Sequence, residues 1–165
     1  MKKLLCVLLC ILVLHGCEMK KDNKNDIPDF IGFKTKINTT INDVKISAEA
    51  EYESFGKLIL TFSLPESAKG MLITLVDGEY SVKYDDLLFS VSAEKMPYSM
   101  LGEMIVTCAE NIKLATIEND NYIFLLNNHI YKMILNESKG FKTLMVDNTY
   151  IIEFEDFEYI MGHTE

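Results

Sequence analysis

Hydrophobic residues at the start of the folded region recur with a helical period. Four of them lie at spacings of three and four residues: Phe30, Phe33, Ile37 and Ile41. This spacing places side chains on one face of an α-helix. Pro28 and Asp29 come directly before the run and favour the start of a helix. The pattern therefore predicts a helix over residues 30–41.

From residue 44 onward the period changes to two. In the segment VKISAEAEYE every second residue is apolar or aromatic, which is typical of a strand with one buried face. Asp77-Gly78 separates two further runs and suits a tight hairpin turn. The first half of the chain therefore predicts strands over residues 44–53, 57–64, 71–76, 79–84 and 87–92.

A second helical pattern follows Pro97 and Ser99. Its apolar stripe consists of Leu101, Met104, Ile105, Cys108 and Ile112. These positions lie on one face of an amphipathic helix. We therefore expect a second helix in this region.

The remainder of the chain alternates short apolar runs with polar turns. Strands are predicted over residues 122–126, 130–135, 141–146 and 150–154. Their connections are too short for crossover helices, so the sheet should be antiparallel. The predicted fold class is α+β: a curved antiparallel sheet with about two helices packed on one face, in a single domain of residues 30–165.

The N-terminus carries a targeting pattern. Lys2 and Lys3 precede an uncharged run over residues 4–14, which is too short to span a bilayer and fits a cleaved signal sequence. The segment Leu14-His15-Gly16-Cys17 resembles the bacterial lipobox. The resemblance implies a lipoprotein signal peptide over residues 1–16 and attachment of acyl chains, such as palmitate, at Cys17.

Residues 17–29 are polar and of mixed charge, and we interpret them as the lipidated cysteine and a flexible tether. The expected location is the extracytoplasmic face of the cell membrane, held by the Cys17 lipid anchor. Removal of the signal would leave Cys108 as the one free thiol, so no internal disulfide is expected.

Charge excludes one class of partner. The chain has a formal net charge of −9 and no arginine, whereas nucleic-acid binding needs a basic surface. A nucleic-acid partner is therefore not expected.

Residues able to support catalysis are scarce. Neither a nucleophile elbow, a phosphate-binding loop nor a metal-binding cysteine pair occurs in the sequence. His129 and His163 are predicted to lie in surface loops, and Cys108 lies on the apolar stripe of the second helix. The acidic run of Glu153, Glu155, Asp156 and Glu158 alternates with aromatic residues, as a solvated strand face does. We expect no enzymatic activity, no catalytic residue, no cofactor and no metal.

Methionine is unusually frequent in the predicted elements. The methionines concerned are Met71, Met96, Met100, Met104, Met133 and Met145. Methionine fills irregular apolar space and tolerates changing partners. The residues therefore fit either a promiscuous apolar cavity or ordinary core filling.

The segments FSLPESAKGMLITLVDGEYSVKY and MPYSMLGEMIVTCAENI resemble bacterial lipoproteins of the LolA-like superfamily, membrane-anchored type. The resemblance implies an unclosed β-barrel with helices on its concave face and an apolar cavity beneath them. It assigns the cavity and its lid to Met100, Leu101, Met104, Ile105, Phe62 and Leu60. Carriers of the family latch the cavity with an arginine, which this chain lacks.

Two functions follow as hypotheses. The first is a membrane-anchored, non-enzymatic binding module that holds a lipid, an acyl chain or a lipoprotein in the apolar cavity. The alternative is a protein-interaction lipoprotein that positions or activates an envelope enzyme, such as a peptidoglycan amidase. The exposed acidic sheet face and the missing arginine favour the alternative.

Overall fold

The computed structural model describes residues 27–53, 56–92, 95–96 and 98–160. The predicted signal peptide and Cys17 lie outside these residues, as does most of the tether. The described elements are β1 (Gly32–Ile41), β2 (Val44–Glu53), β3 (Lys57–Leu64), the 3₁₀ turn η2 (Glu66–Ala68), β4 (Leu72–Val76), β5 (Glu79–Tyr84), β6 (Leu87–Val91), α2 (Ser99–Asn111), the 3₁₀ turn η4 (Ile112–Leu114), β7 (Thr116–Glu118), β8 (Asn121–Leu126), β9 (His129–Leu135), β10 (Phe141–Val146) and β11 (Tyr150–Tyr159).

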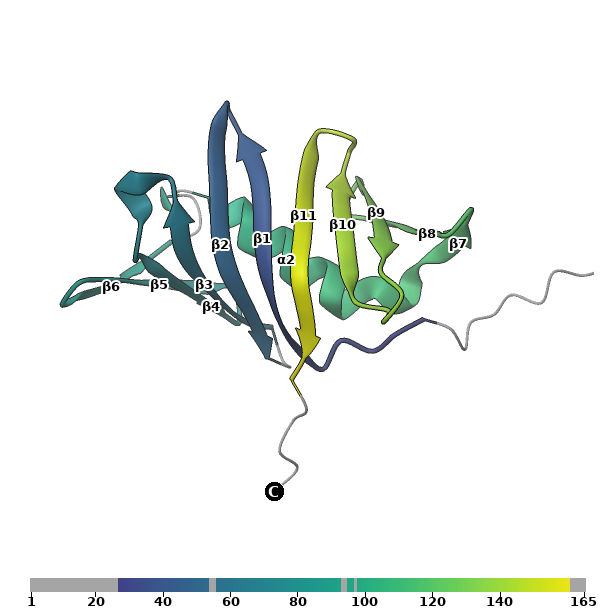
Figure 1. The fold of residues 1–165 in the computed structure, drawn as a ribbon, viewed down its shortest axis with the longest axis horizontal. Helices are drawn as coiled ribbons and strands as arrows, with labels where there is room; N and C mark the ends of the chain where they lie inside the picture. The colour runs from purple at the N-terminus through teal and green to yellow at the C-terminus, as the bar shows by residue number, and fades with distance from the viewer. Residues whose placement is uncertain (1–26, 54–55, 93–94, 97, 161–165) are drawn as a thin grey trace, which may run out of the picture.

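All these strands form one antiparallel sheet, in the order β6-β5-β4-β3-β2-β1-β11-β10-β9-β8-β7. The sheet consists of two meanders, one before α2 and one after it, which join where β1 pairs with β11. It curves so that its outer strands reach past the ends of α2, which lies against the inner face (Figure 1). The predicted curved antiparallel sheet is therefore confirmed.

The core lies between the concave face of the sheet and α2. Alternate residues of each long strand point into it, as Phe33 and Ile37 do on β1 and Leu58, Leu60 and Phe62 do on β3. The convex face of the central strands carries lysines and glutamates instead. This one-sided burial is the expected behaviour of an antiparallel sheet with one wet face.

The prediction of about two helices is wrong. The described residues contain one α-helix, and most of the predicted helix over residues 30–41 is strand β1. The spacing of four between Phe33, Ile37 and Ile41 is also a multiple of two, so it fits a strand as well as a helix. Thr35 lies between them on the same face and is buried. Its β-branched side chain suits a strand, and its hydroxyl finds an acceptor there.

The other predicted elements are confirmed within a residue or two of their expected ends, except that β11 extends to Tyr159, five residues beyond the predicted end at residue 154. The sequence interpretation missed β7, which has three residues and no buried side chain. It lacks the alternation of buried and exposed positions on which strand prediction depends.

An aromatic cluster packs on the sheet where the two meanders meet. Phe30 stacks on Phe141 at a centroid distance of 4.2 Å, and Phe33 stacks on Phe157 at 4.9 Å. Gly140, directly before β10, lies against the ring of Phe157, so that a Cβ atom at this position would overlap the ring. The absence of a side chain at residue 140 is therefore a condition for this packing.

We expect Gly140→Ala to destabilise the protein by about 1–3 kcal/mol, the usual cost of overpacking a core. Urea denaturation followed by circular dichroism measures the change. Because the added methyl group meets the Phe157 ring, the cost should largely disappear in a Phe157→Ala background. Equal costs in the two backgrounds would contradict this explanation.

Candidate functional site

The helix α2 presents an apolar face to the sheet. Its buried residues are Leu101, Gly102, Met104, Ile105, Cys108 and Ala109. Their spacing of three and four places them on one side of the helix. The candidate site is therefore the interface between α2 and the concave face of the sheet.

A glycine allows the helix to lie close to the sheet. A Cβ atom at Gly102 would already be in contact with Leu58, Leu75 and the Tyr80 hydroxyl, at 3.5–3.6 Å. These residues belong to β3, β4 and β5. The start of α2 therefore packs on the N-terminal meander.

The structure brings the six predicted cavity residues into one core. Leu101 and Ile105 are fully buried, and Met104, Leu60 and Phe62 are at most 5% exposed. Met100 is half-buried and packs against the same core. The residues predicted to line a cavity are thus neighbours, and in this structure they contact one another as a packed core.

Three surface hollows are described, and none of them includes these six residues. A hollow of about 280 Å³ lies beside the C-terminal part of α2, between Asp29, Tyr52 and Lys113. Hollows of about 440 Å³ and 370 Å³ lie around the ends of β1 and β2 and along β4 and β5. Because Leu101 and Ile105 are fully buried against the sheet, a ligand that reached them would have to displace part of this packing.

The N-terminus of α2 is held by one tyrosine. The Tyr80 hydroxyl donates a hydrogen bond of 2.7 Å to the carbonyl oxygen of Ser99. Burial raises the pKa of the Tyr80 hydroxyl well above its ordinary value of 10.0, and the carboxylate of Glu103 raises it further. The N-cap residue, Tyr98, has a left-handed backbone and makes no side-chain capping bond. The Tyr80 bond is accordingly the main polar contact described at this end of the helix.

Cys108 lies in the centre of the interface and is fully buried. Burial raises the pKa of its thiol well above the ordinary value. Because the thiolate is the nucleophilic form, this environment suits an inert core residue rather than a catalytic one.

His129, the histidine that lies within the described residues, contacts Asp147. His129 Nδ1 lies 2.6 Å from Asp147 Oδ2, and the backbone N–H of Ile130 donates to Asp147 Oδ1 at 2.8 Å. The hydrogen bond to His129 is the largest cause that lowers the pKa of Asp147. Both side chains are solvent-exposed at the start of β9 and the β10–β11 turn, where they fasten neighbouring strands. His163 lies outside the described residues.

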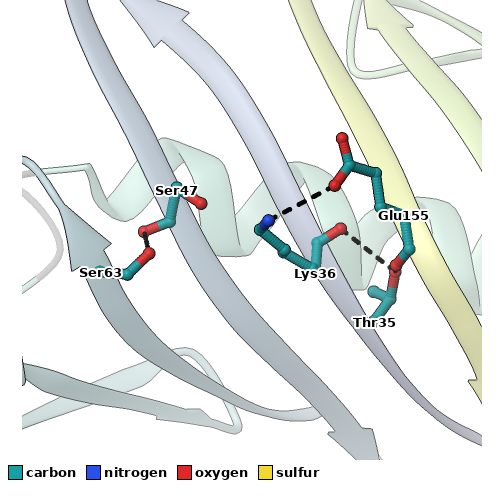
Figure 2. A network of polar contacts seen from close by, with 5 residues as sticks. All are labelled: Thr35, Lys36, Ser47, Ser63 and Glu155. Atoms are coloured by element: carbon teal, nitrogen blue, oxygen red, sulfur yellow. Dashed lines mark hydrogen bonds and ion pairs between the residues drawn. The ribbon is translucent and has the colours of Figure 1, made fainter.

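The acidic run on β11 faces solvent from the convex side. Lys36 lies 3.5 Å from Glu155 across the β1–β11 pair, and the pairing register shifts between Lys34 and Lys36. At this irregularity the Thr35 hydroxyl donates to the carbonyl oxygen of Glu155 at 2.8 Å (Figure 2). The sequence interpretation missed Thr35, because a threonine between lysines gives no signal of burial.

Further chemistry is not apparent in the described ranges. Among these residues no group of three or more His, Cys, Asp or Glu side chains could hold a metal ion. The described part of the chain also contains no helix long and apolar enough to span a membrane.

No protein-family model and no curated protein matches this sequence. Among solved structures, the chain is similar to the LolA superfamily protein NE2245 from Nitrosomonas europaea. The match covers 86% of this chain and 92% of that chain, with 8% sequence identity and a TM-score of 0.49. Residue roles are not transferred at this identity, so the function proposed below rests on the residues of this chain.

We expect Tyr80→Phe to destabilise the protein by about 0.5–1.5 kcal/mol, the usual net contribution of a hydrogen bond. Hydrogen exchange of the backbone amides in the first turns of α2 should become faster. Tyr84→Phe, which changes an exposed tyrosine of the same strand, serves as the control. Unchanged exchange in Tyr80→Phe would show that other contacts hold the helix.

The same hydroxyl predicts a pH dependence. Because the pKa of Tyr80 is raised in the folded state, its contribution to stability is complete below the unfolded pKa of 10.0 and is lost as the pH rises above it. We expect Tyr80→Phe to lose less stability than the unsubstituted protein between about pH 9 and about pH 11. Parallel alkaline losses in the two proteins would contradict this assignment.

Proposed function

We propose that the protein is a membrane-anchored, extracytoplasmic binding module, without enzymatic activity, that holds an acyl chain of a lipid or lipoprotein between α2 and the concave sheet. One observation carries the proposal: a single α-helix of 13 residues is the main cover of the concave apolar face. Binding then replaces the packing of α2 on the sheet by contacts with the acyl chain.

The composition of the interface supports this proposal. An acyl chain needs a long, dry, apolar surface and few polar partners. Apart from Gly102 and Cys108, the side chains on the buried face of α2 are aliphatic or methionine, and two methionines, Met100 and Met104, lie on the helix. Methionine side chains can repack around different apolar partners.

The attachment of the helix also supports it. Moving α2 away from β5 breaks the described hydrogen bonds of one group, the Tyr80 hydroxyl, which lies 2.7 Å from the carbonyl oxygen of Ser99 and 3.5 Å from Glu103 Oε1. The remaining attachment there is apolar packing, which an acyl chain of similar chemistry can replace. The helix is therefore suited to serve as a displaceable lid.

Native mass spectrometry of residues 18–165, purified without detergent, tests the proposal. Omitting Cys17 ensures that any bound acyl chain is a ligand and not the anchor. We expect a bound mass that disappears after extraction with organic solvent. A folded protein that carries no ligand, and that binds no added fatty acid or phospholipid, would refute the proposal.

A matched pair of variants localises the site. Met100→Lys places a charge on the inner side of the helix and should weaken binding of a fluorescent fatty acid by at least about tenfold. Met145→Lys makes the same change at a half-buried methionine on the convex face, and binding should be unaffected. Equal effects of the two substitutions would place the ligand elsewhere.

The membrane anchor requires its own test. We expect Cys17→Ser to abolish labelling by an alkyne analogue of palmitate, because serine has no thiol to acylate. We also expect the substitution to prevent removal of residues 1–16, because cleavage before this residue follows acylation of the thiol. Intact mass measurement of the membrane fraction distinguishes the outcomes. Unchanged labelling in Cys17→Ser would refute the predicted anchor.

The alternative function, a protein-interaction lipoprotein that positions or activates an envelope enzyme, is favoured by a different observation. The strand at one edge of the sheet, β6, exposes apolar side chains and lacks a partner on its outer side within the described residues. A stoichiometric partner in an affinity purification would support this function.

A further inference from the structure

The sheet has two edges of different character. One edge is β7, which has three residues and ends in Glu118. Short edge strands that carry charges resist pairing with other chains. The other edge is β6, with the five residues Leu87–Val91 and no charged residue or proline among them. This strand lacks the usual protection of a sheet edge.

Strand β6 exposes apolar side chains on both of its faces. On the convex side Leu88 is 73% exposed, next to Lys83 of β5. On the concave side Leu87 is 66% and Phe89 is 47% exposed, although the cross-strand neighbour of Phe89, Val82, is buried. The apolar surface of the core therefore continues beyond the cover that α2 provides.

The pairing of β6 with β5 is regular. It runs from Tyr80–Val91 to Tyr84–Leu87 without a shift of register. A β-bulge, which would twist the edge away from incoming strands, is thus absent from this described pair. Within the described residues, the outer side of β6 carries no paired strand and offers its backbone N–H and C=O groups to an added strand.

The charges around β6 are mainly acidic. Asp85 and Asp86 form the turn before the strand, and Asp77 and Glu79 lie at the β4–β5 turn, toward the end of β6 at Val91. The nearby lysines are Lys83 and Lys95. An acidic group of side chains therefore lies near each end of an uncharged apolar strand.

A second copy of the chain fits this edge poorly. In an antiparallel pair centred on Phe89, the Asp85-Asp86 turn of each copy would approach the end of the other copy's β6, near Glu79. Like charges across a strand pair are destabilising. The net charge of −9 adds general repulsion between copies.

We propose that β6 is a docking strand for an extended segment of a basic partner protein, which adds a twelfth strand to the sheet. The partner segment is apolar at its centre, where it covers Leu87, Leu88 and Phe89, and carries lysine or arginine at both ends. Backbone hydrogen bonds supply affinity, and the flanking charges select the partner. The site is separate from the interface beneath α2 and does not depend on lipid binding.

Two synthetic peptides test this proposal against the full-length protein in mild detergent. The peptide KKVIVTVKK has an apolar centre with basic ends, and EEVIVTVEE has the same centre with acidic ends. We expect the basic peptide to bind at least about tenfold more tightly by fluorescence anisotropy. We also expect binding to slow hydrogen exchange of the backbone amides in β6.

Matched variants locate the peptide on the sheet. Leu88→Lys should weaken binding of the basic peptide at least about tenfold, because it places a like charge at the centre of the strand. Leu125→Lys is the control, since Leu125 is 67% exposed but belongs to β8, an internal strand of the sheet. Both substitutions change exposed side chains, so both proteins should fold.

Several outcomes would overturn the proposal. Peptides that bind equally, fail to bind, or protect amides outside β6 would do so. A dimer that disappears in Leu88→Lys would show that a second copy occupies the strand instead. Binding to phosphatidylcholine vesicles that is lost in Leu88→Lys, but retained in Leu125→Lys, would assign β6 to a lipid surface.

Discussion

The need to bury the concave face of one large sheet governs this structure. An antiparallel sheet with one apolar face must cover it, and here a single helix of 13 residues is the principal cover. The sheet compensates by curving, so that strands from both meanders reach the helix (Figure 1). Gly102 permits close contact with β3, β4 and β5, and the pairing of β1 with β11 holds the two meanders together. Because this one helix does not reach the edge of the sheet, apolar surface at β6 is left without cover.

Two side-chain hydroxyls bond to backbone carbonyl oxygens where neighbouring strands change register. Thr35 is buried beside a shift of register, and its hydroxyl reaches the carbonyl oxygen of Glu155 on the neighbouring strand (Figure 2). The Ser63 hydroxyl similarly donates to the carbonyl oxygen of Ser47, at 3.1 Å, where β2 and β3 change register. Irregularities of this kind bend strands and increase their twist. Short side-chain hydroxyls thus satisfy backbone groups that a regular ladder would have paired.

The sequence predicts the sheet better than the helices, for a physical reason. Strands with one wet face alternate visibly, and Asp77-Gly78 or Asn127-Asn128 marks their turns, whose asparagines and aspartates adopt positive φ values. The residues of β1 are predicted as a helix because a spacing of four fits the helical period and the strand period of two. Thr35 also gives no sign of its buried position, because its side chain is polar. Four of the six predicted cavity residues share the buried face of the amphipathic helix α2, and the other two, Leu60 and Phe62, lie on the buried face of β3. Their packing into a core, and the exposure of β6, depend on strand order, which periodicity does not encode.

The two proposed sites lie on opposite sides of one strand. On its inner face β5 carries Tyr80, whose hydroxyl holds the first turn of α2, and on its outer edge it pairs with β6. A strand added to β6 would reinforce this edge and leave the helix contact in place, because the added backbone bonds lie in the plane of the sheet. An acyl chain would instead enter between α2 and the sheet and move the helix away from the concave face. The Met100→Lys and Leu88→Lys substitutions therefore separate the two activities. Met100→Lys changes the contact between α2 and the sheet, and Leu88→Lys changes the outer edge of β6. Neither substitution alters the buried residues of β5, Tyr80 and Val82.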